Sequence, residues 1–512
     1  MFCLFIIMVN IDGSNLTIKD VVNVSRFYEN VKISKNQLSK VMKNRKKLED
    51  LIDSGISIYG VNTGFGDLLN VKIERKSAVE LQRNLIRSHS SGTGDPFQDE
   101  IVRAAMLIRA NALTKGYSGV RKEIIEFLIN MLNKNLIPVV PSRGSVGASG
   151  DLAPLAHMVL AMMGEGEIKY NGKIMLAKEA LELAGMNPIL PLEKEGVALI
   201  NGTSFMAAIA SLAVYDSINI LKNAIVSFSL SLEALNGTDD AYRNEILSLR
   251  PQPGQILIGN EIMKLIEGSE IIEKSRSVKV QDAYSLRCTP QVYGPVYDTL
   301  TFVKGIVERE INSVTDNPIV IDRSYSGGNF HGEYMAFSMD FLGIAMSEIA
   351  NISERRIARL VDSKLSGLPP FLTRDSGLNS GMMIAQYTAA SLVSENKVLA
   401  HPASVDSIPT SANQEDHVSM GMAACIKTMQ ILKNVKAVIA IEYLTSAQAL
   451  EFKKFSMGKG NSLAYEKIRE KIKPLEKDRP LYKDINELIS MIEKNEIINA
   501  LENNGIKILI NP

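Results

Sequence analysis

Seven long segments of this chain repeat apolar residues at helical spacing and contain few Gly or Pro breaks, and this pattern constrains the fold more than any other feature. They cover residues 119–135, 203–235, 296–312, 333–361, 382–400, 418–452 and 484–504. Strand signals are few, and no regular alternation of strands and helices is present. The sequence therefore predicts an all-α protein built as a bundle of long helices.

One of these segments, Ser211 to Leu235, is apolar enough to resemble a membrane span. Polar residues such as Asp216, Lys222 and Glu233 interrupt it, so a buried bundle helix is the better interpretation. A small hairpin is predicted at Ile168–Ile174, where Asn-Gly separates two short alternating runs.

The spacing of loops and helices divides the chain into three expected regions. Residues 1–200 form a loop-rich N-terminal region, residues 201–452 a central bundle of long helices, and residues 453–512 a C-terminal helical region. Breaks rich in turn-forming residues separate the helical segments. These breaks lie at 88–97, 141–150, 251–255, 324–332 and 366–381.

The chain has 57 basic and 57 acidic residues, so its formal net charge is zero. Nothing in that balance favours a nucleic acid or a membrane surface. Cys3, Cys288 and Cys425 are widely spaced, which excludes a disulfide framework and fits a reduced, cytoplasmic setting. The apolar start Met1–Met8 lacks the charged region of a secretory signal, and we expect Met8 to be the true initiator.

The most unusual loop is Gly144-Ser-Val-Gly-Ala-Ser-Gly-Asp-Leu-Ala-Pro-Leu-Ala-His157, which has no bulky residue between Val146 and Leu152. Such a segment lets two backbones approach closely. It then opens a helix, since Asp151 suits a helix N-terminus and Pro154 falls in the first turn. The loop has two ordinary interpretations, a tight capped turn or an anion-binding loop, although no Lys follows the glycines as in a phosphate-binding loop.

In its fourteen-residue context, Ala148-Ser149-Gly150 resembles the signature of the aromatic amino acid ammonia-lyases. The resemblance implies that the tripeptide matures autocatalytically to 4-methylideneimidazol-5-one (MIO), with no external cofactor. The amide nitrogen of Gly150 would attack the carbonyl carbon of Ala148, and two waters would leave, one carrying the Ser149 hydroxyl. The product is an electrophile that no ordinary side chain supplies.

A second glycine-rich loop, Tyr59-Gly-Val-Asn-Thr-Gly-Phe-Gly66, is on its own a turn with a packed tyrosine. It resembles the mobile loop of the family, which implies that Tyr59 removes the β-proton of the substrate. Tyr59 can act so only if its surroundings lower its pKa toward the working pH. By the same resemblance His89 would line the pocket for the substrate side chain, and Asn201 would hydrogen-bond the MIO ring and the substrate amine.

The cluster Gln281-Asp-Ala-Tyr-Ser-Leu-Arg-Cys288 offers Arg287, whose guanidinium can hold an α-carboxylate through two hydrogen bonds. The resemblance implies that Gln281 and Tyr284 lie beside it and that Phe330 packs against the MIO. His157 and His331 are interpreted as structural.

Glu415, in Ser411-Ala-Asn-Gln-Glu-Asp-His-Val-Ser-Met420, bears on the substrate. Family members that act on histidine carry Asn-Gln-Glu-Asp-His, while those that act on phenylalanine or tyrosine lack the glutamate. A carboxylate can pair with an imidazole but would be an unfavourable buried charge against a phenyl ring. A metal site from His417, Glu415 and Asp416 is not expected, because the spacing matches no known zinc type.

Taken together, the resemblance runs from about Tyr59 to Met420. It implies deamination of L-histidine to trans-urocanate and ammonia, the first step of histidine degradation, with either Tyr59 or Glu415 as the base. It also implies a fumarase/aspartase-like fold and a homotetramer with shared sites. The alternatives are a tyrosine ammonia-lyase, a 2,3-aminomutase, and a non-catalytic helical scaffold whose loop binds anions.

Overall fold

The computed structural model describes residues 8–68 and 70–512, and its helices greatly outnumber its short strands. The predicted all-α architecture of long helices is confirmed. The interpretation of the stretch before Met8 lies outside the described residues.

The described chain forms two compact units. The first contains the chain up to Tyr215 together with Lys304–Asp340 and Pro402–Ile426, and the second contains Asp216–Val303, Phe341–His401 and Lys427–Pro512. This grouping differs from three contiguous regions at 1–200, 201–452 and 453–512, because the longest helices each contribute residues to both units.

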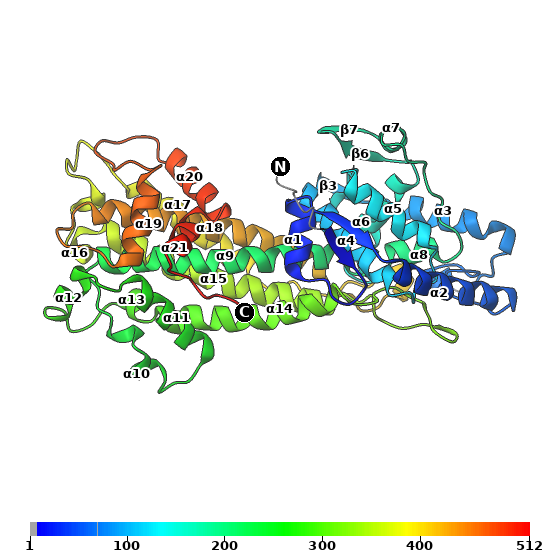
Figure 1. The fold of residues 1–512 in the computed structure, drawn as a ribbon, viewed down its shortest axis with the longest axis horizontal. Coiled ribbons are helices and arrows are strands. Elements are labelled where there is room, and N and C mark those ends of the chain that lie inside the picture. The colour runs from blue at the N-terminus through cyan, green and yellow to red at the C-terminus, as the bar shows by residue number, and fades with distance from the viewer. Residues whose placement is uncertain (1–7, 69) are drawn as a thin grey trace, which may run out of the picture. The chain divides into compact units, whose positions relative to one another are not determined.

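The first unit is built around α4, Asp99–Thr114, whose residues from Ile101 onward are all buried. It packs against α1 and α5 (Figure 1). Seven other described α-helices begin and end in this unit. These helices are α1 Ile18–Arg26, α2 Lys35–Asp53, α3 Ala78–His89, α5 Lys122–Asn133, α6 Leu152–Met162, α7 Ala177–Leu183 and α8 Glu195–Ile200, with short 3-10 helices at Gly66–Leu68, Arg75–Ser77 and Ser411–Asn413.

All the named strands are short and belong to the first unit. The predicted hairpin is confirmed as β6 and β7, in which Asn171 (φ 49°) and Gly172 (φ 77°) adopt the left-handed conformation of a tight hairpin turn. The strands form the pairs β1 Met8–Ile11 with β2 Asn30–Ile33, β3 Thr93–Pro96 with β5 Pro141–Arg143, β4 Ile137–Pro138 with β6 Glu167–Tyr170, β6 with β7 Lys173–Leu176, and β8 Ile319–Val320 with β9 Ser324–Tyr325.

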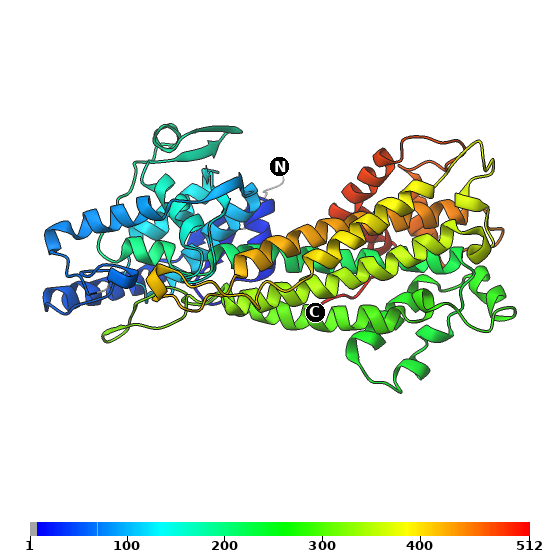
Figure 2. The same ribbon diagram turned by 180° about the vertical axis from the view of Figure 1, so that it is seen from behind.

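Four long helices run alongside one another through the second unit, as Figure 1 and Figure 2 show. They are α9 Ser204–Ala234, α14 Thr289–Glu310, α15 Glu333–Val361 and α18 Gly421–Leu450. Shorter helices complete the unit: α10 Asn244–Leu247, α11 Pro253–Leu265, α12 Glu270–Arg276, α13 Tyr284–Arg287, α16 Ser363–Ser366, α17 Met383–Leu399, α19 Lys459–Arg469, α20 Tyr482–Glu493 and α21 Glu496–Asn503, with 3-10 helices at Asp240–Tyr242 and Pro370–Leu372.

Helix α9 is long and apolar enough to cross a membrane by length and composition alone. However, 78% of its most apolar 18-residue stretch is buried inside the protein. Two of its serines find partners there, since Ser211 donates to the Ala207 carbonyl and Ser231 donates to Glu442. These features are those of a core helix in a helical bundle.

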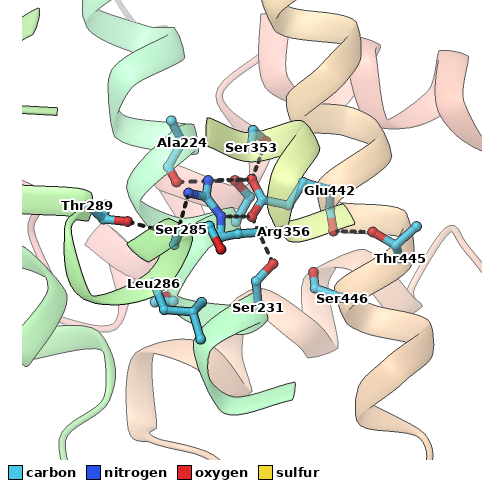
Figure 3. A network of polar contacts seen from close by, with 12 residues as sticks. Ala224, Ser231, Ser285, Leu286, Thr289, Ser353, Arg356, Glu442, Thr445 and Ser446 are labelled. Carbon is cyan, nitrogen blue, oxygen red and sulfur yellow. Dashed lines mark hydrogen bonds and ion pairs between the residues drawn. The ribbon is translucent and has the colours of Figure 1, made fainter. Parts of the chain in front are cut away.

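A fully buried ion pair joins these helices in the second unit. The guanidinium of Arg356 on α15 faces the carboxylate of Glu442 on α18, with Nη2 at 2.9 Å from Oε2 (Figure 3). Ser231 of α9 and Ser353 of α15 donate to the same carboxylate, and Arg356 Nη2 also donates to Tyr293 of α14. Burial alone would lower the pKa of Arg356, but Glu442 and Tyr293 raise it above its ordinary value. One charged pair therefore links four helices.

Candidate active site

The tripeptide Ala148–Gly150 lies in the loop between β5 and α6, and two other segments hold that loop in place. The Met420 amide donates to the Val146 carbonyl at 2.9 Å. The Gly147 carbonyl accepts from the Ser419 hydroxyl at 3.0 Å and from the Gly332 amide at 3.2 Å. The loop is thus fixed by chain that lies far from it in sequence.

Gly150 and Gly202 pair backbone to backbone, and neither position has room for a side chain. Gly150 has φ +73°, and a Cβ there would lie 2.1 Å from the carbonyl group of Gly202. A Cβ on Gly202 would lie 2.2 Å from Arg109 Nη2. This contact is the close backbone approach that the glycine content of the loop predicts.

Two donors converge on the carbonyl oxygen of Ser149. Asn201 Nδ2 donates to it at 3.0 Å and the Gly202 amide donates at 3.1 Å. The side-chain oxygen of Asn201 is buried and has no hydrogen-bond partner within residues 8–68 and 70–512. A buried acceptor without a donor is unfavourable, so this oxygen is suited to accept an N–H group from a bound molecule.

Asp151 immediately precedes α6, as expected, but its carboxylate accepts hydrogen bonds from a different helix. Its Oδ2 accepts the amides of Phe205 and Met206, each at 2.9 Å, in the first turn of α9. Its Oδ1 accepts the Ser145 hydroxyl at 3.1 Å. Burial raises the pKa of Asp151 to about 7, although these hydrogen bonds oppose the shift. Asp151 therefore joins the tripeptide loop to the start of α9.

Glu415 lies directly at the tripeptide, since its Oε1 accepts the Ser149 hydroxyl at 2.9 Å. Its Oε2 accepts the hydroxyl of Thr410, and the Thr410 amide donates to the Glu415 carbonyl at 3.0 Å. The turn between them contains three consecutive residues with positive φ, Ser411, Ala412 and Asn413. Sequence reasoning missed Thr410, because nothing in its local pattern marks it as the residue that orients Glu415.

Tyr59 lies in the second loop, half-buried, and its hydroxyl accepts the Gly66 amide at 2.9 Å. Burial raises the pKa of Tyr59, the Gly66 hydrogen bond lowers it in part, and the charge of Glu415 raises it further. The described groups around Tyr59 together raise its pKa, whereas a tyrosine base requires a lowered one. Gly66 also lies against the Glu415 turn, where a Cβ would meet the Ser411 hydroxyl at 2.3 Å.

His89 is the last residue of α3 rather than part of the expected loop at 88–97. Its Nδ1 lies 3.0 Å from the Ser88 hydroxyl. Burial lowers the pKa of His89, while a hydrogen bond with Leu85 and the charge of Glu415 oppose this shift. Burial therefore favours the neutral ring, while the charge of Glu415 favours the protonated one.

In the first unit Ser149 therefore contacts both Asn201 and Glu415, and the charge of Glu415 acts on the pKa of Tyr59 and of His89. Phe330, half-buried, also belongs to this unit and lies just before α15.

The other expected site residues belong to the second unit, which contains Gln281, Tyr284 and Arg287. Tyr284 and Arg287 are the first and last residues of α13, with the guanidinium 4.6 Å from the centre of the exposed Tyr284 ring. Arg287 Nε donates to the Asp282 carbonyl at 2.9 Å, so its two Nη groups are the ones suited to a bound carboxylate.

The helical scaffold thus holds Ser149 between a small alanine and a glycine, beside the amide of Asn201 and the carboxylate of Glu415. The family model for aromatic amino acid lyases matches residues 16–470. The chain belongs to the aromatic amino acid lyase family. A relative from Thermoplasma volcanium, named probable histidine ammonia-lyase, is 55% identical over 494 residues, which cover 96% of this chain and 100% of that protein. The histidine ammonia-lyase of Caldanaerobacter subterraneus is 53% identical over 500 residues, 97% of this chain and 98% of the relative.

Solved structures agree with this assignment. The histidine ammonia-lyase of Trypanosoma cruzi superposes with a TM-score of 0.90 at 38% identity, covering 97% of this chain and 95% of that one. The tyrosine aminomutase of Streptomyces globisporus superposes with a TM-score of 0.93 at 35% identity, covering 97% and 99%. The same fold therefore carries both lyases and aminomutases, and substrate choice depends on individual side chains.

Proposed function

We propose that this chain is a carbon–nitrogen lyase that converts L-histidine to trans-urocanate and ammonia, the first step of histidine degradation. The observation that carries the proposal is the position of Glu415, whose carboxylate lies at the Ser149 hydroxyl with the neutral His89 ring nearby. The names of the relatives, at 48–55% identity over almost the whole chain, support it. The direct test is to incubate the purified chain with L-histidine, and separately with L-tyrosine, and to follow urocanate and coumarate.

We further propose that Ala148-Ser149-Gly150 forms the MIO group of the family. The residues present fit that group: Gly150 has no Cβ, Ala148 is small, and Asn201 Nδ2 and the Gly202 amide both donate to the Ser149 carbonyl. When formed, MIO supplies an electrophile that takes up the substrate amino group and makes it a better leaving group. No external cofactor is then required.

The remaining roles belong to ordinary side chains. The unpartnered oxygen of Asn201 accepts an N–H from the substrate amine. His89 and Glu415 hold the imidazole, one as a neutral ring and the other as a carboxylate. The β-proton passes to Tyr59 or to Glu415; Tyr59 serves only where an added cation lowers its raised pKa.

We propose roles for the remaining site residues on the basis of the family resemblance. Arg287 holds the substrate carboxylate with Gln281 and Tyr284 beside it, and Phe330 packs against the MIO. We propose that the enzyme is a cytoplasmic homotetramer in which subunits share their sites, so that one chain supplies Ser149 and another supplies Arg287. The exposure of Tyr284, at 70%, is consistent with a surface that a partner covers.

Replacing Arg287 by alanine is expected to lower kcat/KM for histidine by ~10²-fold or more, because a charged contact to the substrate carboxylate is lost. Steady-state kinetics of urocanate formation measure the effect. The matched variant Arg287→Lys keeps the positive charge but not the planar guanidinium. Its kcat/KM should lie between those of the wild type and Arg287→Ala. Equal kinetics for all three proteins would remove Arg287 from the site.

Replacing Glu415 by glutamine is expected to reduce turnover of histidine far more than that of any aromatic substrate. The glutamine keeps the shape and can still meet Thr410, but it cannot pair with an imidazole as a charge. Relative kcat/KM for histidine and tyrosine gives the result. Equal losses on both substrates would show that Glu415 has no part in recognition and would favour a general role as base.

A further inference from the structure

Three side chains with metal-binding atoms gather next to the proposed active site. They are His331, Glu333 and His417, and one ligand atom from each lies within 4.8 Å of the other two. His331 lies just before α15, Glu333 is the first residue of α15, and His417 follows Glu415 by two positions. All three belong to the first unit.

The spacing of the two imidazoles suits a shared cation. His331 Nε2 lies 3.5 Å from His417 Nδ1, and the rings are nearly parallel, with centres 5.5 Å apart. Two nitrogens bound tetrahedrally to zinc at ~2.0–2.1 Å lie about 3.4 Å apart. The competing explanation is a proton on His331 Nε2, which can be donated to His417 Nδ1 or to the His417 carbonyl at 3.3 Å.

The carboxylate of Glu333 distinguishes the two explanations. Its Oε2 is buried and accepts no hydrogen bond from any described residue. A proton held between the two ring nitrogens supplies positive charge but no donor to that oxygen, so the enclosed Oε2 of the half-buried Glu333 still lacks a partner. A cation placed among the three groups neutralises the carboxylate and uses both imidazole lone pairs.

We propose that His331, Glu333 and His417 bind a divalent transition-metal cation of the zinc class. Two neutral imidazoles and one carboxylate are a donor set that zinc accepts, with a water molecule in the fourth position. The site differs from the disfavoured set His417, Glu415 and Asp416. It also gives His331 a ligand role in place of the structural role expected from sequence.

The cation would join two segments that both hold the tripeptide loop. Gly332, between two of the ligands, donates to the Gly147 carbonyl, and Met420, three residues after His417, donates to the Val146 carbonyl. Because Glu415 lies two residues before His417, a cation bound here would tether the segment that carries Glu415. The inference is independent of the substrate, since it concerns binding of the metal itself.

Direct binding measurements test the proposal on the full-length protein after treatment with a chelator and dialysis. Calorimetric titration with Zn²⁺ should give about one site per chain, as the donor set requires. Titration with Co²⁺ should give the intense visible absorption of a tetrahedral nitrogen–oxygen site. Each cation should also raise the unfolding temperature, because it binds the folded state alone.

Three variants are compared. Glu333→Gln removes the charged ligand with little change of shape, His331→Ala/His417→Ala removes both nitrogens, and His401→Ala removes a histidine outside the cluster. We expect Zn²⁺ affinity to fall at least tenfold in the first two and to remain unchanged in the third. If the double variant does not fold, the Zn²⁺ affinity of Glu333→Gln alone tests the proposal. No saturable binding by the wild-type protein, or equal affinity in Glu333→Gln, would overturn the proposal.

Discussion

Replacing Ser149 by alanine is expected to abolish ammonia release while leaving the fold intact. Among the described residues the serine hydroxyl donates to Glu415, and its loss removes little packing. Without that hydroxyl no second water can be eliminated between Cα and Cβ, so the methylidene group of the MIO cannot form. The mass of the intact protein shows whether the ring has formed. The wild-type chain should be lighter than its encoded mass by two waters, and Ser149→Ala should not show that loss. Because the chain has no Trp, the new ring should also add a conspicuous near-ultraviolet band to the wild type.

The matched control is Ser142→Ala, which removes a serine hydroxyl from β5 just before the loop. It should keep both the mass loss and the turnover. Near-wild-type turnover by Ser149→Ala, or an unmodified tripeptide in active protein, would refute the proposed chemistry and leave the anion-binding scaffold as the better explanation.

Replacing Glu442 by glutamine is expected to destabilise the protein by about 3–5 kcal/mol, which is typical when one partner of a buried ion pair is removed. The variant keeps the shape but leaves the fully buried Arg356 without a counter-charge. Ser231 and Ser353 would also lose a carboxylate acceptor. Thermal and urea unfolding, followed by circular dichroism, measure the loss.

The control for this prediction is Glu493→Gln, which breaks the exposed ion pair with Lys436. Exposed pairs contribute about 0–1 kcal/mol, so this variant should unfold almost as the wild type does. The double variant Arg356→Met/Glu442→Met should recover part of the lost stability, because it leaves no buried charge. Equal free energies of unfolding for Glu442→Gln and Glu493→Gln would show that the buried ion pair stabilises the protein no more than the exposed one does.

Helical periodicity predicted the long helices well, because each buries an apolar stripe that repeats in the sequence. Helices α9, α15, α17 and α18 agree with their predicted ranges to within a few residues. Helix α14 begins at Thr289, earlier than the predicted 296, because Pro295 lies inside the helix and does not end it. The predicted helix 484–504 is two helices, since Asn495 adopts a left-handed conformation with φ 56°.

The site was less predictable where it depends on contacts distant in sequence. The tripeptide loop and the start of α6 follow from local glycine and proline signals. The partner of the Asp151 carboxylate does not, because Phe205 and Met206 lie over fifty residues away. The same holds for Tyr59, whose pKa depends on burial and on Glu415 rather than on its own loop.

The contact between Asp151 and the first turn of α9 bears on the order of events as the chain folds. Gly150 pairs with Gly202, and the Asp151 carboxylate accepts the Phe205 amide in the first turn of α9. Because these partners lie over fifty residues from the loop in sequence, we expect the loop to close only after the two segments have met. Cyclisation of the tripeptide would then follow tertiary folding rather than precede it.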